Sequence, residues 1–374
     1  MLLFATISLS LTYFCDFFIN SASANISISS AESMITIEAE SGRVLYAKDE
    51  NKRLPMASTT KILTAIVAIE NVTDLDAKFE IPKEAVGIEG SSIYLRKGEH
   101  LSVRELLYGL MLRSGNDAAV AIAFAVSGSV EEFVKLVNNF VESLNLKNTH
   151  IVTVNGLHDN SHYTSAFDLS KITAYAMKNE VFKEIVSCKE KTISNELGKK
   201  NEKYRFLKNK NRLLKMIDGA DGVKTGYTRK AGRCFVGSAT RNEMQIIVVV
   251  LNCAPMFEET AKLIEKAFTN FERKKLFSKG EIIKAKVLGD EDKEYPIILK
   301  KDIYYPLSKD ELNNVTAKLI INKNLKTPVS TENHIGSISV TLENNLIFSE
   351  NIYTIDIEEN KDFEWFIKKI IKAF

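Results

Sequence analysis

The sequence predicts a mixed α/β domain, then a small all-β domain, then an amphipathic C-terminal segment. Up to about residue 270, apolar residues at helical spacing are interspersed with runs rich in Val and Ile that suit buried strands. From residues 274–280 onward, only short segments of alternating polarity follow. The last residues return to apolar positions three and four apart, which is the spacing of a helix with one apolar face.

The composition is that of a globular protein with balanced charge. The 374 residues are enough for two domains, and 45% are hydrophobic and 26% charged. Because 50 Lys and Arg nearly balance 48 Asp and Glu, the net charge is only +2, and we expect no nucleic-acid partner. The four cysteines form no C-x-x-C pair and no zinc-type cluster, so we expect no metal and no cofactor.

Residues 1–24 have the pattern of a secretory signal peptide. An apolar run through Ile19 is followed by Ala22 and Ala24 in an A-x-A arrangement. No Lys or Arg precedes the run, and Asp16 interrupts it. An uncleaved anchor, or a start codon placed too far downstream, therefore stays open as an alternative.

The elements of the α/β domain follow from hydrophobic periodicity. Alternation over residues 33–46 predicts a β-hairpin. Ser102 and Glu105 form a capping box at the start of a helix. Two Val- and Ile-rich runs, 235–239 and 244–251, predict a buried antiparallel pair. Helical spacing predicts four helices, over residues 58–71, 102–112, 116–126 and 130–144.

The change of composition near residues 274–280 separates the two domains. The first is expected to cover residues 30–272 and the second, all-β domain residues 280–357. Short alternating segments predict the strands of the second domain, over residues 282–287, 295–299, 316–321 and 335–342.

The tail, residues 361–374, predicts a helix lying in a membrane interface. It is far too short to cross a bilayer, and its lysines fall opposite the apolar stripe, where they can meet anionic head groups. Trp365 lies off that stripe. The alternative is a terminal helix packed on the protein's own core. The stripe consists of Phe363, Phe366, Ile367, Ile370, Ile371 and Phe374.

Three short strings in the first domain could carry chemistry: Ser58-Thr59-Thr60-Lys61, Ser114-Gly115-Asn116 and Lys224-Thr225-Gly226. Each alone has a plain structural explanation, as a helix cap, a capping loop or a surface strand. Chance supplies about two matches each to S-x-x-K and S-x-N in such a chain, and K-T-G in roughly one chain in ten. Their order, spacing and settings together favour a catalytic site.

The first and third strings supply what a serine nucleophile needs. A serine hydroxyl is weak until a base removes its proton. Residues three apart in the first turn of a helix share a face, so Lys61 should lie beside Ser58. Lysine acts as a base only when burial or a second cation, here Lys224, lowers its pKa from about 10.4. Lys224, the Thr225 hydroxyl and a strand edge could also hold a peptide that ends in a carboxylate.

At this point the chain resembles the penicillin-binding proteins and serine β-lactamases, which carry S-x-x-K, S-x-N and K-T-G in this order. Residues 155–157 and 162–169 agree with the same family, and the likeness covers roughly residues 30–267. Three fuller strings resemble the low-molecular-mass D-alanyl-D-alanine carboxypeptidases in particular: Pro55-Met56-Ala57-Ser58-Thr59-Thr60-Lys61, Arg113-Ser114-Gly115-Asn116-Asp117-Ala118 and Gly222-Val223-Lys224-Thr225-Gly226-Tyr227-Thr228.

The resemblance implies a five-stranded antiparallel sheet flanked by helices, with a helical lobe beside it. It implies a serine-type carboxypeptidase that removes the terminal D-Ala from peptidoglycan stem peptides ending in D-Ala-D-Ala, through an acyl-enzyme on Ser58. β-Lactams would acylate the same serine. We expect such a protein to be exported and held at the outer face of the cytoplasmic membrane through the C-terminal helix.

The resemblance also implies residue roles. Lys61 would take the proton of Ser58, Ser114 would relay a proton to the leaving D-Ala, and Asn116 would hold the substrate amide and Lys61. The oxyanion would lie between the backbone N–H groups of Ser58 and Tyr227. The substrate-binding residues would be Lys224, Thr225, Gly226 and Tyr227.

Three positions depart from relatives. The second motif is S-G-N rather than the S-D-N of class A β-lactamases, and Tyr227 stands where some relatives have His. Lys210 stands where some members place an Arg near the substrate carboxylate, so its contact with substrate is left open.

A β-lactamase is the nearest alternative function. That enzyme uses a Glu, usually within E-x-x-L-N, to activate the deacylating water, and no Glu between Asn116 and Lys224 is followed by this pattern. A non-catalytic binder of wall peptide or β-lactam would have no need of the intact Ser58 and Lys61. In a structural wall protein the three motifs would be coincidence. Release of free D-Ala separates the enzyme from both.

Overall fold

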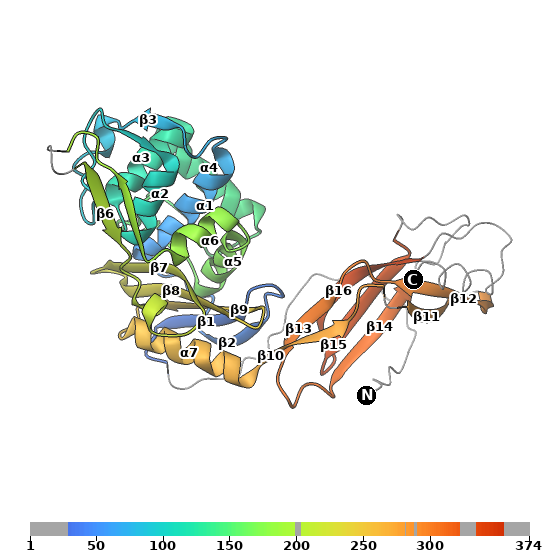
Figure 1. The fold of residues 1–374 in the computed structure, drawn as a ribbon. Helices are drawn as coiled ribbons and strands as arrows, with labels where there is room; N and C mark the ends of the chain where they lie inside the picture. The colour runs from blue at the N-terminus through green and yellow to red at the C-terminus, as the bar shows by residue number, and fades with distance from the viewer. Residues whose placement is uncertain (1–28, 199–202, 281, 288–289, 322–333, 355–374) are drawn as a thin grey trace. The chain divides into compact units, whose positions relative to one another are not determined.

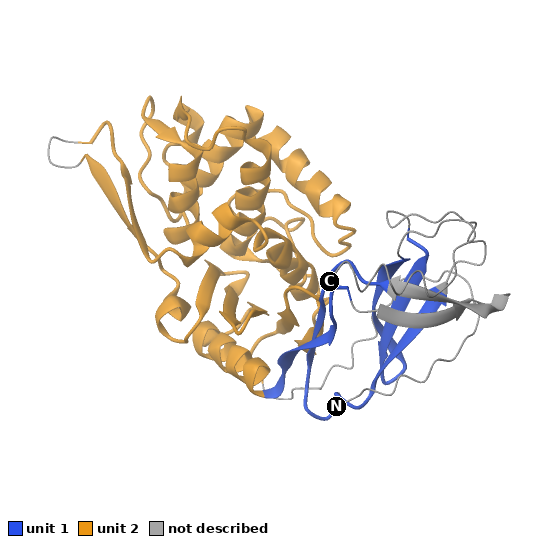
Figure 2. Ribbon diagram, turned by 45° about the vertical axis from the view of Figure 1, so that its right-hand side comes forward, with its two compact units in different colours: residues 1–21, 270–374 blue, residues 22–269 orange. Residues whose placement is uncertain are grey.

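The computed structural model describes residues 29–198, 203–280, 282–287, 290–321 and 334–354, of which 282–287, 290–297 and 321 are described by backbone alone. The signal peptide predicted over residues 1–24 and the helix predicted over 361–374 lie outside these residues. The chain divides into two compact units, one of residues 22–269 and one that contains the chain from Asn270 onward (Figure 2).

The first unit is built on a five-stranded antiparallel sheet in the order β2-β1-β9-β8-β7, as the family resemblance implied. Seven of the eight residues of the strand at its centre, β9, are buried, because both faces of the sheet are covered. The strands are β1 (Ser33–Glu38), β2 (Val44–Lys48), β7 (Ala220–Thr228), β8 (Gly232–Arg241) and β9 (Met244–Leu251).

Helices cover the two faces of this sheet (Figure 1). Helix α7 (Met256–Asn270) lies against one face, and the other helices lie on the opposite side. Every residue from Lys61 to Ile69 of α1 is buried, so this helix forms the centre of the helical layer. The helices of that side are α1 (Lys61–Asn71), α2 (Val103–Leu112), α3 (Asn116–Ser127), α4 (Val130–Ser143), α5 (Ala166–Ala176) and α6 (Glu180–Ser187).

The structure refines several sequence expectations. The capping box of Ser102 and Glu105 is present at the start of α2. The predicted helix over residues 58–71 begins instead as a 3₁₀ turn, η1 (Ala57–Thr60), which runs directly into α1. Helices α5, α6 and α7 and six short elements were not predicted: the pair β3 (Lys78–Glu80) and β4 (His100–Ser102), the hairpin β5 (Glu190–Ser194) and β6 (Tyr204–Lys208), and the turns η2 (Lys83–Ala85) and η3 (Arg212–Lys215).

The second unit is all-β, as predicted. A five-stranded sheet has the order β11-β12-β16-β15-β14, and β10 pairs with β13. Burial alternates residue by residue along β15, which is the pattern of a strand with one face on a core. Its strands are β10 (Glu272–Phe277), β11 (Ile282–Val287), β12 (Asp290–Ile298), β13 (Ile303–Leu307), β14 (Val315–Ile321), β15 (Gly336–Leu342) and β16 (Asn345–Thr354).

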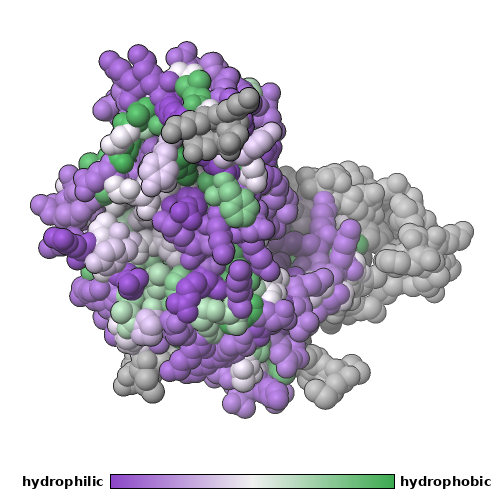
Figure 3. Space-filling view, turned by 60° about the vertical axis from the view of Figure 1, so that its left-hand side comes forward, coloured by the Kyte–Doolittle hydropathy of each residue, from purple (hydrophilic) through white to green (hydrophobic). Residues whose placement is uncertain are grey.

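Two surface properties bear on the surroundings of the protein. Within the described ranges, no helix combines the length and the apolar character needed to cross a bilayer. On the face shown in Figure 3, hydrophobic residues form small, separate patches among hydrophilic ones. Such scattered patches are normal for a protein surface and do not by themselves mark a site.

Candidate active site

The Ser58 side chain is presented by the η1 turn. The hydroxyls of Thr59 and Thr60 donate backward to the carbonyl oxygens of Met56 and Ala57, at 2.6 and 2.8 Å. These two bonds fix the turn from within and occupy the neighbouring hydroxyls. Ser58 itself is half-buried, and its backbone is held at the start of the most buried helix of the unit.

Lys61 lies one turn further along, and its amine contacts three oxygens. Nζ is 2.9 Å from Ser58 Oγ, 2.7 Å from Asn116 Oδ1 and 2.5 Å from the backbone carbonyl oxygen of Asn155. The two carbonyl-type oxygens can only accept hydrogen bonds. A neutral amine has two N–H groups for them and one lone pair, which then points at the Ser58 hydroxyl. A charged amine would donate to all three oxygens, so the pKa of Lys61 decides between the two forms.

The electrostatic surroundings favour that uncharged form. The Lys61 side chain is fully buried, and burial is the main cause that holds its pKa well below the usual range for lysine. The nearby positive charges of Lys224 and Lys210 lower the pKa further, while Asp117 raises it. The sequence-based requirement of a desolvated lysine beside a second cation agrees with this arrangement.

Asn116 is positioned by the loop that precedes β4. Its Nδ2 donates to the Glu89 carbonyl oxygen at 2.5 Å, so its Oδ1 is turned toward Lys61. Its backbone N–H donates to the Ser91 carbonyl oxygen at 2.7 Å. Gly90 has φ +90°, and a Cβ there would lie 2.7 Å from Asn116 Nδ2, so a side chain would collide with this amide. Ser114 is buried in the α2–α3 turn with φ +61°.

Strand β7 brings the third motif to Ser58. A Cβ on Gly226 would lie 3.0 Å from the Ser58 backbone nitrogen, so the glycine lets the strand approach the η1 turn. Lys224 is buried, and its Nζ donates to the Thr225 carbonyl oxygen at 2.9 Å. Burial lowers the pKa of Lys224 to about 7. The Tyr227 side chain is exposed.

Lys210 contributes to the same electrostatic environment. Its amine lies 3.4 Å from the Ser91 hydroxyl, on the loop that positions Asn116. Partial burial, and then the charge of Arg113, lower the Lys210 pKa. Its positive charge in turn lowers the pKa of both Lys61 and Lys224.

A buried histidine supports the η1 turn. His162 Nδ1 accepts the backbone N–H groups of Val152 and Thr153 at 3.0 and 3.2 Å, which places its proton on Nε2. Nε2 lies 2.8 Å from Thr60 Oγ1, the hydroxyl that donates to Ala57. Burial lowers the His162 pKa to about 4. Nothing in the sequence indicated this role, because no local pattern links residue 162 to residue 60.

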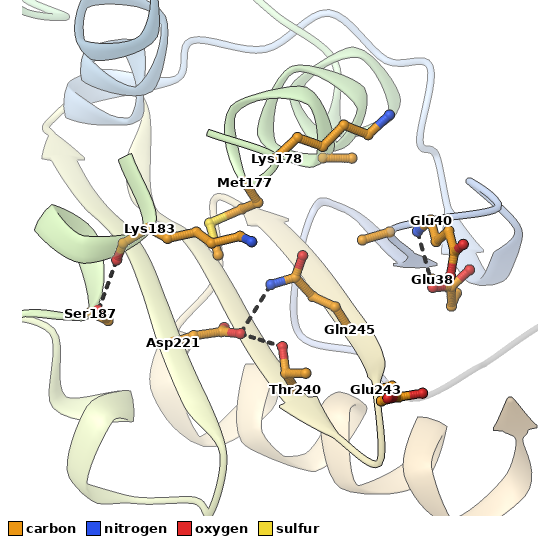
Figure 4. A pocket seen from close by; sticks show the side chains of 12 residues that line it. Glu38, Glu40, Met177, Lys178, Lys183, Ser187, Asp221, Thr240, Glu243 and Gln245 are labelled. Carbon is orange, nitrogen blue, oxygen red and sulfur yellow. Dashed lines mark hydrogen bonds between the residues drawn. The ribbon is translucent and has the colours of Figure 1, made fainter. Parts of the chain in front are cut away.

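A separate cavity of about 360 Å³ lies at the opposite end of β7 (Figure 4). Asp221 lines it and accepts hydrogen bonds from Thr240 and Gln245 at 2.5 and 3.0 Å. No residue of the three motifs lines this cavity. Among the described residues, no group of three or more His, Cys, Asp or Glu side chains is arranged to hold a metal ion.

Comparison with known proteins agrees with this geometry. The family model of D-alanyl-D-alanine carboxypeptidases matches residues 20–254, and that of the penicillin-binding protein 5 C-terminal domain matches residues 271–359. The D-alanyl-D-alanine carboxypeptidase DacF of Bacillus subtilis is 32% identical over 348 residues, which are 91% of this chain and 88% of that protein.

Two further relatives give the same result. DacA of Escherichia coli, also a D-alanyl-D-alanine carboxypeptidase, is 32% identical over 338 residues, 85% of this chain and 81% of DacA. Among solved structures, penicillin binding protein 5 from Haemophilus influenzae superposes with a TM-score of 0.76 at 29% identity and covers 90% of this chain and 99% of its own. The chain thus belongs to the D-alanyl-D-alanine carboxypeptidase family of serine peptidases.

Proposed function

We propose that the chain is a serine-type D-Ala-D-Ala carboxypeptidase, which removes the terminal D-Ala from peptidoglycan pentapeptides and is acylated by penicillins at Ser58. The observation that carries this proposal is the buried Lys61 amine, 2.9 Å from Ser58 Oγ, with two carbonyl-type oxygens to take its N–H groups. An activated serine at this place is what acyl transfer requires. The named activity of the relatives supplies the substrate class.

Acylation begins when neutral Lys61 accepts the Ser58 proton. Ser58 Oγ attacks the carbonyl carbon of the D-Ala-D-Ala amide, and the carbonyl oxygen becomes an oxyanion. The backbone N–H groups of Ser58 and Tyr227 stabilise that charge. Ser114 relays the proton that Lys61 took to the amide nitrogen, the C–N bond breaks, and free D-Ala leaves while the acyl group stays on Ser58 as an ester.

Deacylation uses the same amine a second time. Lys61, neutral again, takes a proton from a water molecule that attacks the ester carbon. The bond from the carbonyl carbon to Ser58 Oγ breaks, and the oxygen recovers its proton. The shortened peptide leaves with a new terminal carboxylate.

Substrate binding centres on Lys224, Thr225 and Gly226. A terminal carboxylate beside the Lys224 amine forms a charge-assisted hydrogen bond. Since the Lys224 pKa is about 7 without a ligand, an incoming anion raises it, and binding takes up a proton near neutral pH. Asn116 holds the substrate amide while its Oδ1 keeps Lys61 in place.

The site acts outside the cytoplasm in this proposal, since its substrate is the cell wall. Residues 1–24 direct export, residues 30–272 form the catalytic domain, residues 280–357 the β domain, and residues 361–374 bind the outer face of the cytoplasmic membrane. Deletion of residues 361–374 should release the protein from anionic vesicles and leave soluble activity unchanged. Vesicle binding that survives the deletion would refute the anchor.

The test of the activity is a Ser58→Ala variant of the full chain. We expect the unchanged protein to release D-Ala from a pentapeptide and to gain the mass of one penicillin, mapped to the peptide that holds residue 58. The variant should do neither and should keep the melting temperature of the parent. Labelling that persists in the variant would refute the assignment, and rapid turnover of nitrocefin would favour a β-lactamase instead.

A further inference from the structure

Every N–H group of the Arg205 guanidinium, on β6, is hydrogen-bonded within the protein. Its Nε donates to the Ile93 carbonyl oxygen at 2.8 Å, and Nη2 donates to that of Tyr94 at 2.9 Å. Nη1 donates to the Ser194 carbonyl oxygen at 2.7 Å, and Nη1 and Nη2 each bind one oxygen of Glu99, at 2.6 and 2.8 Å. All five N–H groups of the guanidinium are therefore bonded.

The segment that Arg205 binds, residues 93–95, is held from its other side by Asp117. The carboxylate of Asp117 accepts the backbone N–H groups of Ile93 and Leu95 at 3.0 and 3.1 Å and the Ser92 hydroxyl at 2.5 Å. The segment's carbonyl groups thus bind Arg205, and its N–H groups bind Asp117. Between the two, Tyr94 has φ +61°, a left-handed conformation that is uncommon for residues other than glycine.

The same loop reaches the catalytic lysine. Asn116 precedes Asp117 in the chain. Its Nδ2 and its backbone N–H donate to the Glu89 and Ser91 carbonyl oxygens, and its Oδ1 accepts a hydrogen bond from Lys61. The loop from residue 89 to residue 95 is therefore bonded at one end to the residue that orients Lys61 and at the other end to Arg205. The Arg205 and Glu99 side chains are 9% and 0% exposed, so the ion pair itself is largely shielded from water, whereas the bond from Nη2 to Tyr94 lies at the surface.

We infer that Arg205 is a positioning residue for Lys61: it fixes residues 89–95 against Asn116 and Asp117 and so keeps Lys61 dry and aimed at Ser58. This inference rests on the proposed function of Ser58 and Lys61. Arg205 touches neither residue and is not itself catalytic. Its fork suits this task because a lysine amine in its place could not bond three carbonyl groups and both oxygens of a carboxylate at once.

Loosening the loop should change the charge state of Lys61. The charged groups that act on Lys61 are Lys224 on β7, Asp117 on α3 and Lys210 before η3. Water admitted beside Lys61 would reduce the effect of burial, which is the main cause of its low pKa. The neutral fraction at pH 7 would then fall and would recover as the pH rises.

The test compares Arg205→Lys with Arg241→Lys in the full chain. Arg241 forms a similar two-pronged ion pair, with Glu265 at 2.8 and 2.5 Å, but it lies at the end of β8 and contacts α7. The second-order rate of Ser58 acylation by a fluorescent penicillin is measured from pH 6 to pH 10. We expect Arg205→Lys to be about tenfold slower at pH 7, a deficit that shrinks toward pH 10, and Arg241→Lys to follow the parent.

Each other outcome is decisive. A folded Arg205→Lys protein with the rate and pH profile of the parent, or one slowed equally at every pH, would overturn the inference. Should Arg205→Lys fail to fold, Glu99→Gln, which removes the charge but keeps the shape, is judged by the same two criteria. Acylation of the unchanged protein tests the proposed function separately, so the failure of one is not the failure of the other.

Discussion

Two cations of the first unit are in opposite situations: Lys61 is fully buried, and the Arg205 side chain is 9% exposed. Lys61 contacts a hydroxyl, an amide oxygen and a backbone carbonyl, all of them neutral. Arg205 contacts three backbone carbonyls and the Glu99 carboxylate. Burial without a counter-ion lowers a pKa, whereas burial with one preserves the charge.

The two residue types match these two roles. A lysine amine can lose its proton within the accessible pH range, and burial without a carboxylate makes it do so. An arginine stays charged, so its burial needs an anion. The resulting ion pair fixes the neighbouring segments in place and cannot act as a base. The partner of each cation therefore sets its role: neutral partners leave Lys61 able to lose its proton, and a carboxylate keeps Arg205 charged and fixed in place.

The largest effect is expected when the lysine is given a permanent charge. In Lys61→Arg the guanidinium cannot accept the Ser58 proton, so acylation by penicillin should fall about 10³-fold. Lys171→Arg is the control, because Lys171 is a half-buried lysine whose pKa is also lowered by burial, but it bonds to Gly42 in the β1–β2 turn. A Lys61→Arg protein that acylates at the rate of the control would show that Lys61 is not the base.

Removal of Glu99, the counter-ion of Arg205, should lower the stability of the fold as well as the activity. Glu99→Ala leaves Arg205 buried without its counter-ion, and we expect the free energy of unfolding to fall by about 3–5 kcal/mol. Glu265→Ala breaks the partly exposed pair with Arg241 and should cost no more than about 1 kcal/mol. Urea denaturation measures the free energy of unfolding of both variants. Equal losses in the two would contradict the structural role assigned to the Arg205–Glu99 pair.

His162 extends the comparison to a third side chain, a buried histidine that is kept neutral for structural reasons. The pKa of His162 is about 4 in the folded protein, against the ordinary value of 6.5 that applies to the unfolded chain. As the pH falls, the unfolded chain therefore binds the proton before the folded protein does. The contribution of His162 to the free energy of unfolding should be fully present above pH 6.5. It should fall by about 3 kcal/mol as the pH is lowered to 4. His162→Gln should remove that part of the fall.

The control for this prediction is His158→Gln, since His158 is exposed. The free energy of unfolding of both variants is measured across this pH range. If His162→Gln keeps the pH dependence of the parent, the buried neutral histidine does not contribute as described.

The smallest effect is expected at Lys224. Lys224→Gln removes the charge that we propose to hold the substrate carboxylate, and KM for a D-Ala-D-Ala peptide should rise about 10- to 100-fold. Because Lys224 lowers the Lys61 pKa, its loss should also move the acid limb of penicillin acylation to higher pH. Steady-state kinetics with the exposed Lys215→Gln as control measures the first effect. An unchanged KM would contradict the carboxylate role.

The sequence allowed the local part of this site to be predicted. Ser58 and Lys61 are three residues apart, and helical geometry alone places them together. The capping box of α2 and the strands around residues 235–251 were also readable from spacing. Such features depend on neighbours in the chain, which a single sequence displays.

The remaining part depends on contacts between distant segments. The Asn155 carbonyl oxygen that holds Lys61 is a backbone group 94 residues away, and no side-chain pattern marks it. Arg205 lies in a β5–β6 hairpin whose β5 strand, Glu-Lys-Thr-Ile-Ser, is mostly polar and exposed, so no hydrophobic alternation indicated it. Its pairing with Glu99 exists only after the fold has formed.

Whether Lys61 is the base that activates Ser58 is tested most directly by measuring the protonation state of Lys61 in the resting protein. Nitrogen and carbon NMR of the full chain with labelled lysines, assigned by comparison with Lys61→Arg, follows each amine as the pH is raised. We expect one resonance, absent from Lys61→Arg, whose pKa lies well below those of the exposed lysines. If the Lys61 amine titrates together with the exposed lysines, it is charged at neutral pH and cannot be the base that activates Ser58.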